Sequence, residues 1–235
     1  MTPQYKRVLL KLSGEMLGKG GKVLSYESLR NTAERIKLLH DMGVEIGIVV
    51  GGGNIMRGRS AEGMDRNRAD HMGMLSTAIN SLALQDAIER AGMPCTVLSA
   101  VEMQRFCDTY SARKANSELS KSNVVVFACG TGIPFFSTDT AAALRALEIG
   151  ADALLLAKSV DAVYSADPKL HKDAVRYSKL TYDKVIRDNL KATDISTITL
   201  CREHNMPILL FSMADASSFI EAVCGGNSGT IISGQ

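Results

Sequence analysis

Basic residues stand directly beside glycine-rich turns in the first quarter of the chain. Lys11 is followed by the turn Ser13-Gly14. Further along, the run Gly51-Gly52-Gly53 is followed by Arg57 and Arg59. Backbone N–H groups freed by such turns bind anions, and arginine matches phosphate with a planar fork of donors. These residue types predict a site for several phosphate groups, with Lys11 as a point charge.

The same turns follow apolar runs that are typical of buried strands. Residues 8–12, 44–50 and 123–129 are almost continuously apolar, and each run ends at a glycine or serine-glycine turn. Such runs indicate parallel strands covered on both faces. A helix predicted after Ser25 separates the first two runs, as in a βαβ unit. Ligands bind at the carboxyl ends of parallel strands, so we expect the turns to meet at one edge.

The order of elements predicts an α/β fold, an open and mainly parallel twisted sheet with helices on both faces. We expect one domain over residues 1–235, because no linker or repeat interrupts the pattern. A long helix is predicted from Asp70 to near Gly92, after a polar and mobile stretch at residues 61–68. Apolar residues cover most of its circumference, which predicts a central helix or one packed on another subunit.

Two aspartates lie at the predicted starts of helices. Asp70 is read as a helix N-cap or as an acceptor for a ligand's hydroxyl groups. Asp139, before an alanine-rich helix at residues 140–148, is read as an N-cap or as a site residue. The sequence alone leaves both pairs of interpretations open.

Composition excludes several classes of protein. Net charge is +2, tryptophan is absent and aromatic residues are 5%, which argues against nucleic-acid binding. No apolar stretch approaches the ~20 residues of a membrane span. Five scattered cysteines predict free thiols in a cytosolic protein. Cys201 and His204 have metal-ligand spacing but lack a second pair, so no resident metal is predicted.

The chemistry that fits best is phosphoryl transfer. The P-loop motif, the dinucleotide fingerprint and the serine-hydrolase elbow are all absent from the sequence. Phosphoryl transfer requires positioning and charge neutralisation more than a protein nucleophile. A phosphate acceptor is already ionised near neutral pH, so neither a general base nor a covalent intermediate is required.

Five motifs, in order over nearly the whole chain, resemble the bacterial uridylate (UMP) kinase family of the amino-acid kinase superfamily. They are Lys11-Leu12-Ser13-Gly14-Glu15, Gly51-Gly52-Gly53-Asn54 with Arg57-Gly58, Asp70-His71-Met72-Gly73-Met74, the segment from Thr131 to Asp139, and Val163-Tyr164-Ser165-Ala166-Asp167-Pro168. The resemblance implies transfer of phosphate from ATP to UMP, giving UDP, in pyrimidine nucleotide biosynthesis. It also implies Mg²⁺ carried with ATP, and a cytoplasmic homohexamer.

The resemblance further implies a role for each matching residue. Lys11 would lie between the donor and acceptor phosphates, while Asp139 and Asp194 would orient Lys11 and the Mg-bound phosphates. The implied ATP-binding residues are Lys11, Leu12, Ser13, Gly14, Gly53, Arg57, Lys158, Tyr164 and Asp167. The implied UMP-binding residues are Gly52, Asp70, Thr131, Gly132, Ile133, Pro134, Phe135, Phe136, Ser137 and Thr138.

The chain departs from the family pattern at several positions. Ile133 replaces the usual asparagine, so one polar contact in the nucleotide pocket is missing or replaced. Lys158-Ser159 replaces the usual threonine-lysine, so the adenine contacts at these two positions should differ from the family pattern. Positions that carry basic residues for GTP activation in many relatives are here Gln85, Glu89, Thr96 and Asn123, which predicts weak GTP activation or none. Two alternatives stay open: a superfamily relative acting on a carboxylate or carbamate, and a nucleotide-sensing protein without turnover.

Overall fold

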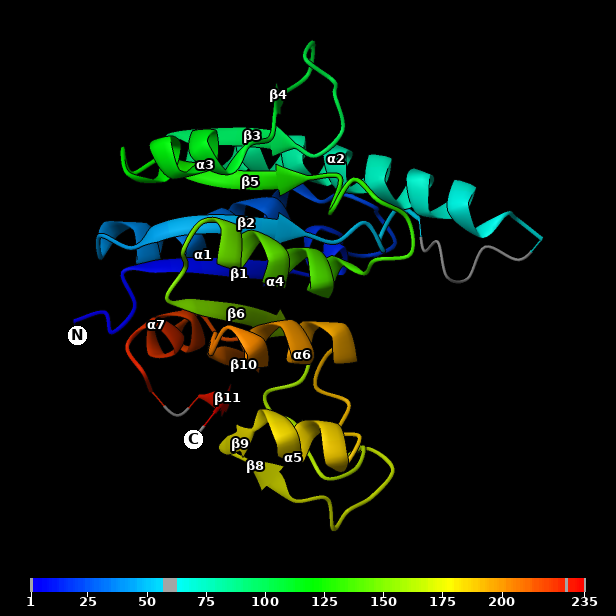
Figure 1. Cartoon of the computed structure of the whole chain (residues 1–235). Helices are drawn as coiled ribbons and strands as arrows, with labels where there is room; N and C mark the ends of the chain where they lie inside the picture. The colour runs from blue at the N-terminus through cyan, green and yellow to red at the C-terminus, as the bar shows by residue number, and fades with distance from the viewer. Residues whose placement is uncertain (1, 57–62, 227, 235) are drawn as a thin grey trace.

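The structure, a computed structural model, describes residues 2–56, 63–226 and 228–234. Its main sheet has nine strands in the order β4-β3-β5-β2-β1-β6-β10-β11-β9 (Figure 1). These strands are β1 (Arg7–Leu12), β2 (Glu45–Val50), β3 (Cys95–Ser99), β4 (Asp108–Thr109), β5 (Val124–Ala128), β6 (Ala153–Lys158), β9 (Lys179–Thr181), β10 (Ile208–Ser212) and β11 (Gly229–Ser233). A separate small sheet pairs β7 (Val163–Tyr164) with β8 (Arg176–Tyr177).

Every neighbouring pair from β4 to β10 in that order is parallel. Strand β11 runs antiparallel to β10 and parallel to β9. The predicted open, mainly parallel sheet is therefore confirmed. Because these strands run in one direction, their carboxyl ends and the turns that follow share one edge.

Helices cover both faces of the sheet and give the fold three layers (Figure 1). Those in the described part of the chain are α1 (Tyr26–Asp41), α2 (Arg66–Arg90), α3 (Ala112–Leu119), α4 (Thr138–Glu148), α5 (Tyr182–Arg187), α6 (Ile195–Glu203) and α7 (Ser217–Val223). Helices α1, α2 and α7 pack on one face, and α3, α4, α5 and α6 pack on the other. The helices predicted on both faces are confirmed as well.

Side chains of β1 alternate between the two faces, as they must in a strand. Val8, Leu10 and Leu12 join the core under α1 and α2, whereas Leu9 joins the core under α4. Lys11 therefore points to the α4 face, at the carboxyl end of a strand that is otherwise buried.

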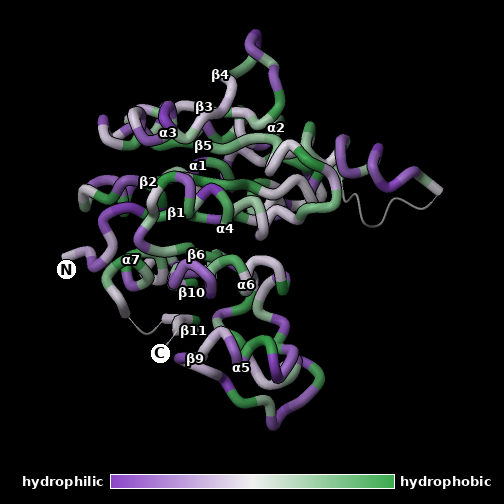
Figure 2. The backbone as a smooth tube through the Cα atoms, viewed as in Figure 1, coloured by the Kyte–Doolittle hydropathy of each residue, from purple (hydrophilic) through white to green (hydrophobic). Residues whose placement is uncertain are grey.

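Helix α2 begins earlier than the sequence predicted. It starts at Arg66, and its N-cap is Asp65, whose side chain accepts the backbone N–H of Arg68 at 3.0 Å. Asp70 is thus in the second turn and is not the cap. With 25 residues the helix is about 37 Å long. Its hydrophilic first turns project beyond the carboxyl edge of the sheet (Figures 1 and 2).

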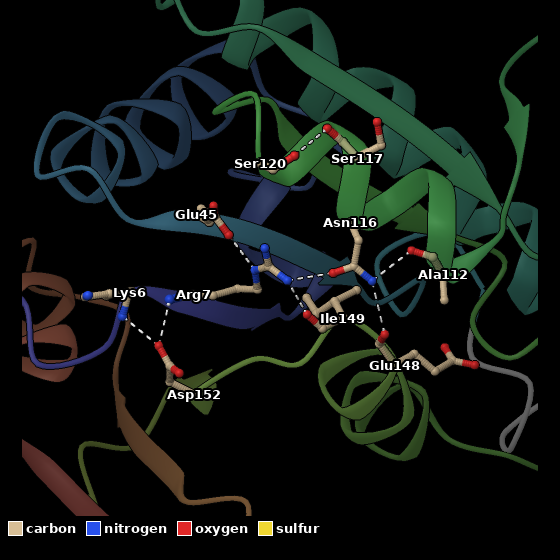
Figure 3. Close-up of polar contacts among 10 residues, drawn as sticks. All are labelled: Lys6, Arg7, Glu45, Ala112, Asn116, Ser117, Ser120, Glu148, Ile149 and Asp152. Carbon is tan, nitrogen blue, oxygen red and sulfur yellow. Dashed lines mark hydrogen bonds and ion pairs between the residues drawn. The ribbon is translucent and has the colours of Figure 1, made fainter.

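A polar network holds the opposite end of β1 (Figure 3). The Arg7 guanidinium forms an ion pair with Glu45 of β2. Its Nη1 donates to Asn116 Oδ1 and to the carbonyl of Ile149, each at 2.6 Å. The Asp152 carboxylate accepts the backbone N–H of Arg7 at 2.9 Å. Every charge in this network has a counter-charge or a hydrogen-bond partner. The hydrogen bonds of Arg7 to Asn116 and Ile149 join β1 to α3 and to the end of α4.

In the described ranges, no helix combines the length and the apolar character that crossing a membrane requires.

Candidate functional site

A cavity of about 620 Å³ opens at the carboxyl edge of the sheet. Its lining comes from the ends of β1, β2 and β5, the first turns of α2, and the starts of α4 and α6. The lining residues are Lys11, Gly52, Gly53, Met56, Arg66, Asp70, Gly73, Met74, Thr77, Cys129, Gly130, Thr131, Ile133, Phe136, Ser137, Thr138, Asp139 and Asp194. Turns that are far apart in sequence thus meet around one hollow.

The Asp139 carboxylate makes contacts with three other side chains at this cavity. Its Oδ1 lies 2.7 Å from Lys11 Nζ, and its Oδ2 lies 2.8 Å from Lys158 Nζ. The hydroxyl of Thr193 donates to the same Oδ2 at 2.7 Å. One carboxylate therefore holds two ammonium groups, from the neighbouring strands β1 and β6.

Charge and burial act in opposite directions on this carboxyl group. Burial raises the pKa of Asp139, but the ammonium groups of Lys11 and Lys158 lower it by more. The pKa of Asp139 therefore lies well below its usual range, and the group is ionised at neutral pH. With side chains only 12% and 11% exposed, Lys11 and Asp139 form a preorganised charged centre.

Strand register explains how two lysines reach one aspartate. Lys11 pairs with Leu156 across the parallel β1–β6 ladder. Lys158 lies two residues beyond Leu156, so both lysines point to the same face of the sheet. That face carries α4, whose first turn presents Asp139. The sequence had suggested that Lys158 contacts adenine. The geometry instead places Lys158 beside the charged centre.

Asp139 is not the cap of α4. Ser137 is the N-cap, and its Oγ accepts the backbone N–H of Thr140 at 3.0 Å. Thr140 Oγ1 also lies 2.7 Å from the hydroxyl of Ser196, in the first turn of α6. The N-termini of α4 and α6 are thus joined at the cavity, where helix dipoles favour negative charge.

The glycines after β1 and β2 are required by close packing. A Cβ on Gly14 would come within 2.4 Å of the Gly51 carbonyl oxygen, and one on Gly52 would come within 2.8 Å of the Gly73 carbonyl oxygen. The turn after β1 therefore lies against the turn after β2, and α2 lies against both. Gly52 and Gly53 still line the cavity.

Residues 129–137 form a wall with an unusual backbone. Cys129, Gly130, Gly132 and Phe135 all have φ between 58° and 78°, in the left-handed region. Thr77 Oγ1 accepts the N–H of Cys129 at 2.8 Å, so α2 holds the beginning of this wall. Ile133 is 57% exposed and presents an apolar side chain to the cavity.

Asp70 joins α2 to the same wall. Its Oδ2 accepts the backbone N–H of Phe135 at 2.8 Å and lies 2.9 Å from Arg66 Nε. The carboxylate lines the cavity and can accept hydrogen bonds from a ligand's hydroxyl groups.

The structure brings about half of the predicted site residues to the cavity lining. These are Lys11, Gly52, Gly53, Asp70, Thr131, Ile133, Phe136, Ser137, Thr138, Asp139 and Asp194. Gly132, Pro134 and Phe135 belong to the same wall but do not line the cavity. The Leu12 side chain is buried in the core and so does not reach it. Ser13 caps the 3₁₀ turn η1 (Gly14–Leu17) beside it. Arg57 lies outside the described residues.

The residues predicted for the adenine side lie apart from this cavity. Tyr164 donates its hydroxyl to Asp161 Oδ1 at 3.0 Å, within the small β7–β8 region. Asp167 accepts the N–H of Lys169 at 2.9 Å in a local turn. Neither residue lines the 620 Å³ cavity, so their ATP contacts stay predictions.

Sequence reasoning missed one face of α2. Arg66, Gly73, Met74 and Thr77 line the cavity at helical spacing around Asp70. Positions four before and three, four and seven after one residue share a helix face, so Asp70 and this spacing could have identified them. Met56, Cys129 and Gly130 were also missed.

Cysteine and histidine form no centre in the described part of the chain. No group of three or more His, Cys, Asp and Glu side chains there could hold a metal ion. All five cysteines are free thiols. Burial raises the pKa of Cys201 to about 12, so this thiol is unreactive at neutral pH.

Comparison with known proteins gives a consistent result. The model of the amino acid kinase family matches residues 6–212. The crystal structure of a UMP kinase from Bacillus anthracis superimposes with a TM-score of 0.96, at 36% identity, over 98% of this chain and 97% of that chain. A UMP kinase from Ureaplasma parvum gives 0.93 at 35% identity, over 98% and 99%. A uridylate kinase from Archaeoglobus fulgidus gives 0.74 at 28% identity, over 96% and 99%.

Proposed function

This chain belongs to the amino acid kinase family, and from that premise we propose that it transfers the terminal phosphoryl group of ATP to UMP, giving UDP and ADP. The similar UMP kinases supply the substrate assignment. Within a cell the reaction would be a step of pyrimidine nucleotide biosynthesis, in the cytosol.

The observation that carries the proposal is the sharing of Asp139 by Lys11 and Lys158. Phosphoryl transfer spreads negative charge over the moving group and the oxygens on either side of it. Two fixed ammonium groups beside a cavity neutralise such charge without reorganising during the reaction. Asp139 would act as the positioning residue that keeps both ammonium groups in place.

In this proposal Lys11 contacts the transferred phosphoryl group from the cavity floor. Lys158, which lies just behind, contacts the ATP phosphates and not the adenine. Gly53 and the N-termini of α4 and α6 complete the anion site. No protein base is needed, because the UMP phosphate is itself the nucleophile.

Mg²⁺ would enter with ATP and is not expected as a resident ion. Asp194, at the start of α6, lines the cavity and is the carboxylate to which this proposal assigns the ion. One or two carboxylates plus substrate phosphates is the usual Mg²⁺ environment in kinases. When bound, the ion would supply further charge neutralisation at the phosphates.

The acceptor would occupy the volume between α2 and residues 129–137. There Asp70 would accept hydrogen bonds from the ribose hydroxyl groups, and the wall would enclose the uracil. We also propose a homohexamer, because Met72, Leu75 and Ile79 form an apolar stripe on the outer face of α2 that is 40–56% exposed. Sedimentation velocity measures that assembly directly.

A coupled assay for ADP release tests the reaction. Mg-ATP is supplied with UMP, CMP, dUMP, N-acetylglutamate or carbamate in separate reactions, and turnover is expected with UMP. Turnover with a carboxylate or carbamate only would contradict the proposal. The absence of turnover with every acceptor, together with measurable UMP binding, would indicate a nucleotide sensor.

A further inference from the structure

Arg66 is a cavity residue to which the proposed reaction assigns no role. It lies in the first turn of α2, four residues before Asp70, and its Nε is 2.9 Å from Asp70 Oδ2. The same Oδ2 accepts the backbone N–H of Phe135 at 2.8 Å. The guanidinium carbon of Arg66 lies 5.8 Å from the centre of the Phe135 ring. Arg66, Asp70 and Phe135, here called the α2 clamp, thus join the start of α2 to the wall at residues 129–137.

The α2 clamp is a poor device for stabilising the fold. The Arg66 side chain is 43% exposed, and an exposed ion pair within one helix contributes little to stability. Phe135 adopts a φ of 73°, which a residue with a side chain rarely adopts. Backbone strain of this kind is concentrated at binding sites, where surrounding contacts maintain it.

The orientation of the Asp70 carboxylate is what the clamp does determine. Two donors, one charged and one from the backbone, converge on a single oxygen atom, and charge-assisted hydrogen bonds are the stronger kind. They fix the rotation of a carboxylate that is 15% exposed and lines the cavity. A hydroxyl-bearing ligand meets an acceptor that is already oriented.

We propose that Arg66 is a positioning residue that orients Asp70 toward the ribose hydroxyl groups of the acceptor nucleotide, and so sets the preference for ribonucleotides over deoxyribonucleotides. This inference rests on the proposed function, and it adds that the α2 clamp favours a substrate with a ribose 2′-hydroxyl group. The 2′-hydroxyl is the group that distinguishes UMP from dUMP, and Asp70 is the acceptor that the clamp holds.

Arg66→Gln and Arg68→Gln form a matched pair for the test. Arg68 lies in the same turn, is exposed, and its side chain makes no ion pair with any residue that the structure describes. Initial rates are measured with UMP and with dUMP at saturating Mg-ATP. We expect Arg66→Gln to raise KM for UMP about tenfold, with kcat, KM for ATP and Tm little changed. The ratio of kcat/KM for UMP to that for dUMP should fall by a similar factor.

Arg66→Lys is the conservative variant. A lysine keeps the charge within reach of Asp70, so it should restore most of the preference for UMP. The inference is overturned if Arg66→Gln has the same kinetic constants as Arg68→Gln. It is also overturned if Arg66→Gln lowers kcat/KM for UMP and for dUMP by the same factor, which is the result expected of a merely structural residue. If the unmodified protein does not turn over UMP, the proposed function fails separately. Calorimetric binding of UMP and dUMP to the same variants then decides the role of Arg66.

Discussion

The two ends of strand β1 each hold a partly buried cation, but the two networks differ in charge. At the amino end, Arg7 has one carboxylate, Glu45, and two neutral acceptors (Figure 3). At the carboxyl end, Lys11 shares its carboxylate with a second lysine, Lys158. Arg7 and Glu45 thus form a one-to-one ion pair, whereas two lysines share the single carboxylate of Asp139.

The difference is the reason for proposing a structural role for the first network and a functional role for the second. Buried charges normally come paired, because an uncompensated one is costly. The matched network around Arg7 joins β1 to three other segments and requires no ligand. The two lysines that share Asp139 lie beside a cavity, where a bound anion would provide a further counter-charge. Asp70 and Asp194 also line this cavity, but they lie on α2 and at the start of α6.

The largest expected effect is on catalysis, at the carboxyl end. Lys11→Ala should lower kcat about 10³-fold, equivalent to about 4 kcal/mol, because it removes the charge nearest the transferred group. Stability should change little, since Asp139 keeps Lys158. ADP release and UMP binding by calorimetry are measured on the same preparation. If the substitution abolishes both turnover and UMP binding, the result would contradict a role confined to the transition state.

Asp139→Asn should lower stability by about 3 kcal/mol at pH 7, because two partly buried ammonium groups lose their counter-charge. The folded pKa of Asp139 is depressed, so its stabilisation is fully present above the ordinary value of about 3.9 and is lost as the pH falls through the depressed value. Urea unfolding of the unmodified protein and of Asp139→Asn should give a difference in the free energy of unfolding that is constant from pH 7 to about pH 5. The difference should shrink below about pH 4, and a difference independent of pH would refute this account.

Lys158→Met should lower kcat about 10²-fold, or about 2.7 kcal/mol, less than Lys11→Ala because Lys158 does not line the cavity. Exposed Lys179 of β9 provides the control substitution Lys179→Met. The comparison of kcat for ATP and GTP as donors separates the two interpretations of Lys158. If Lys158→Met changes only the ratio of kcat with ATP to kcat with GTP, the result would support the contact with adenine that the sequence suggested for Lys158.

Arg7→Met should have the smallest effect of the four, about 2 kcal/mol on the free energy of unfolding, because it leaves Glu45 and Asn116 without their partner. The kcat of the folded enzyme should stay within twofold of the original. Lys6→Met is the control, since the side chain of Lys6 is exposed. A fall in kcat with unchanged stability would reverse the contrast between the two ends of β1.

The centre of the fold was predictable from sequence because long apolar runs indicated the adjacent strands β1, β2 and β5. Residues 8–12 and 123–129 could only be buried, and the glycines after them marked the carboxyl edge. The start of α2 was not predictable in this way. Arg66 and its neighbours are polar on all sides, because they project beyond the sheet and have no core to face. Hydrophobic periodicity carries no signal there.

The second lysine partner of Asp139, Lys158, was beyond sequence reasoning for a different reason. The place of Asp139 before an alanine-rich helix fits a cap as well as a site, and only the structure shows that Ser137 is the cap. Lys158 lies 147 residues after Lys11 in the chain, and strand order makes them neighbours. Motif resemblance located the residues, but it could not supply the register that directs both lysines to one face.

The central place of β1 also affects the chain while it is being synthesised. Its neighbour β2 is complete by Val50, but its other neighbour, β6, does not exist until Lys158 has been added. A nascent sheet of the first five strands therefore carries β1 as an open and apolar edge. Such edges pair readily with other chains. The strand that places Lys11 at the centre of the finished sheet is therefore an open edge until β6 has been made.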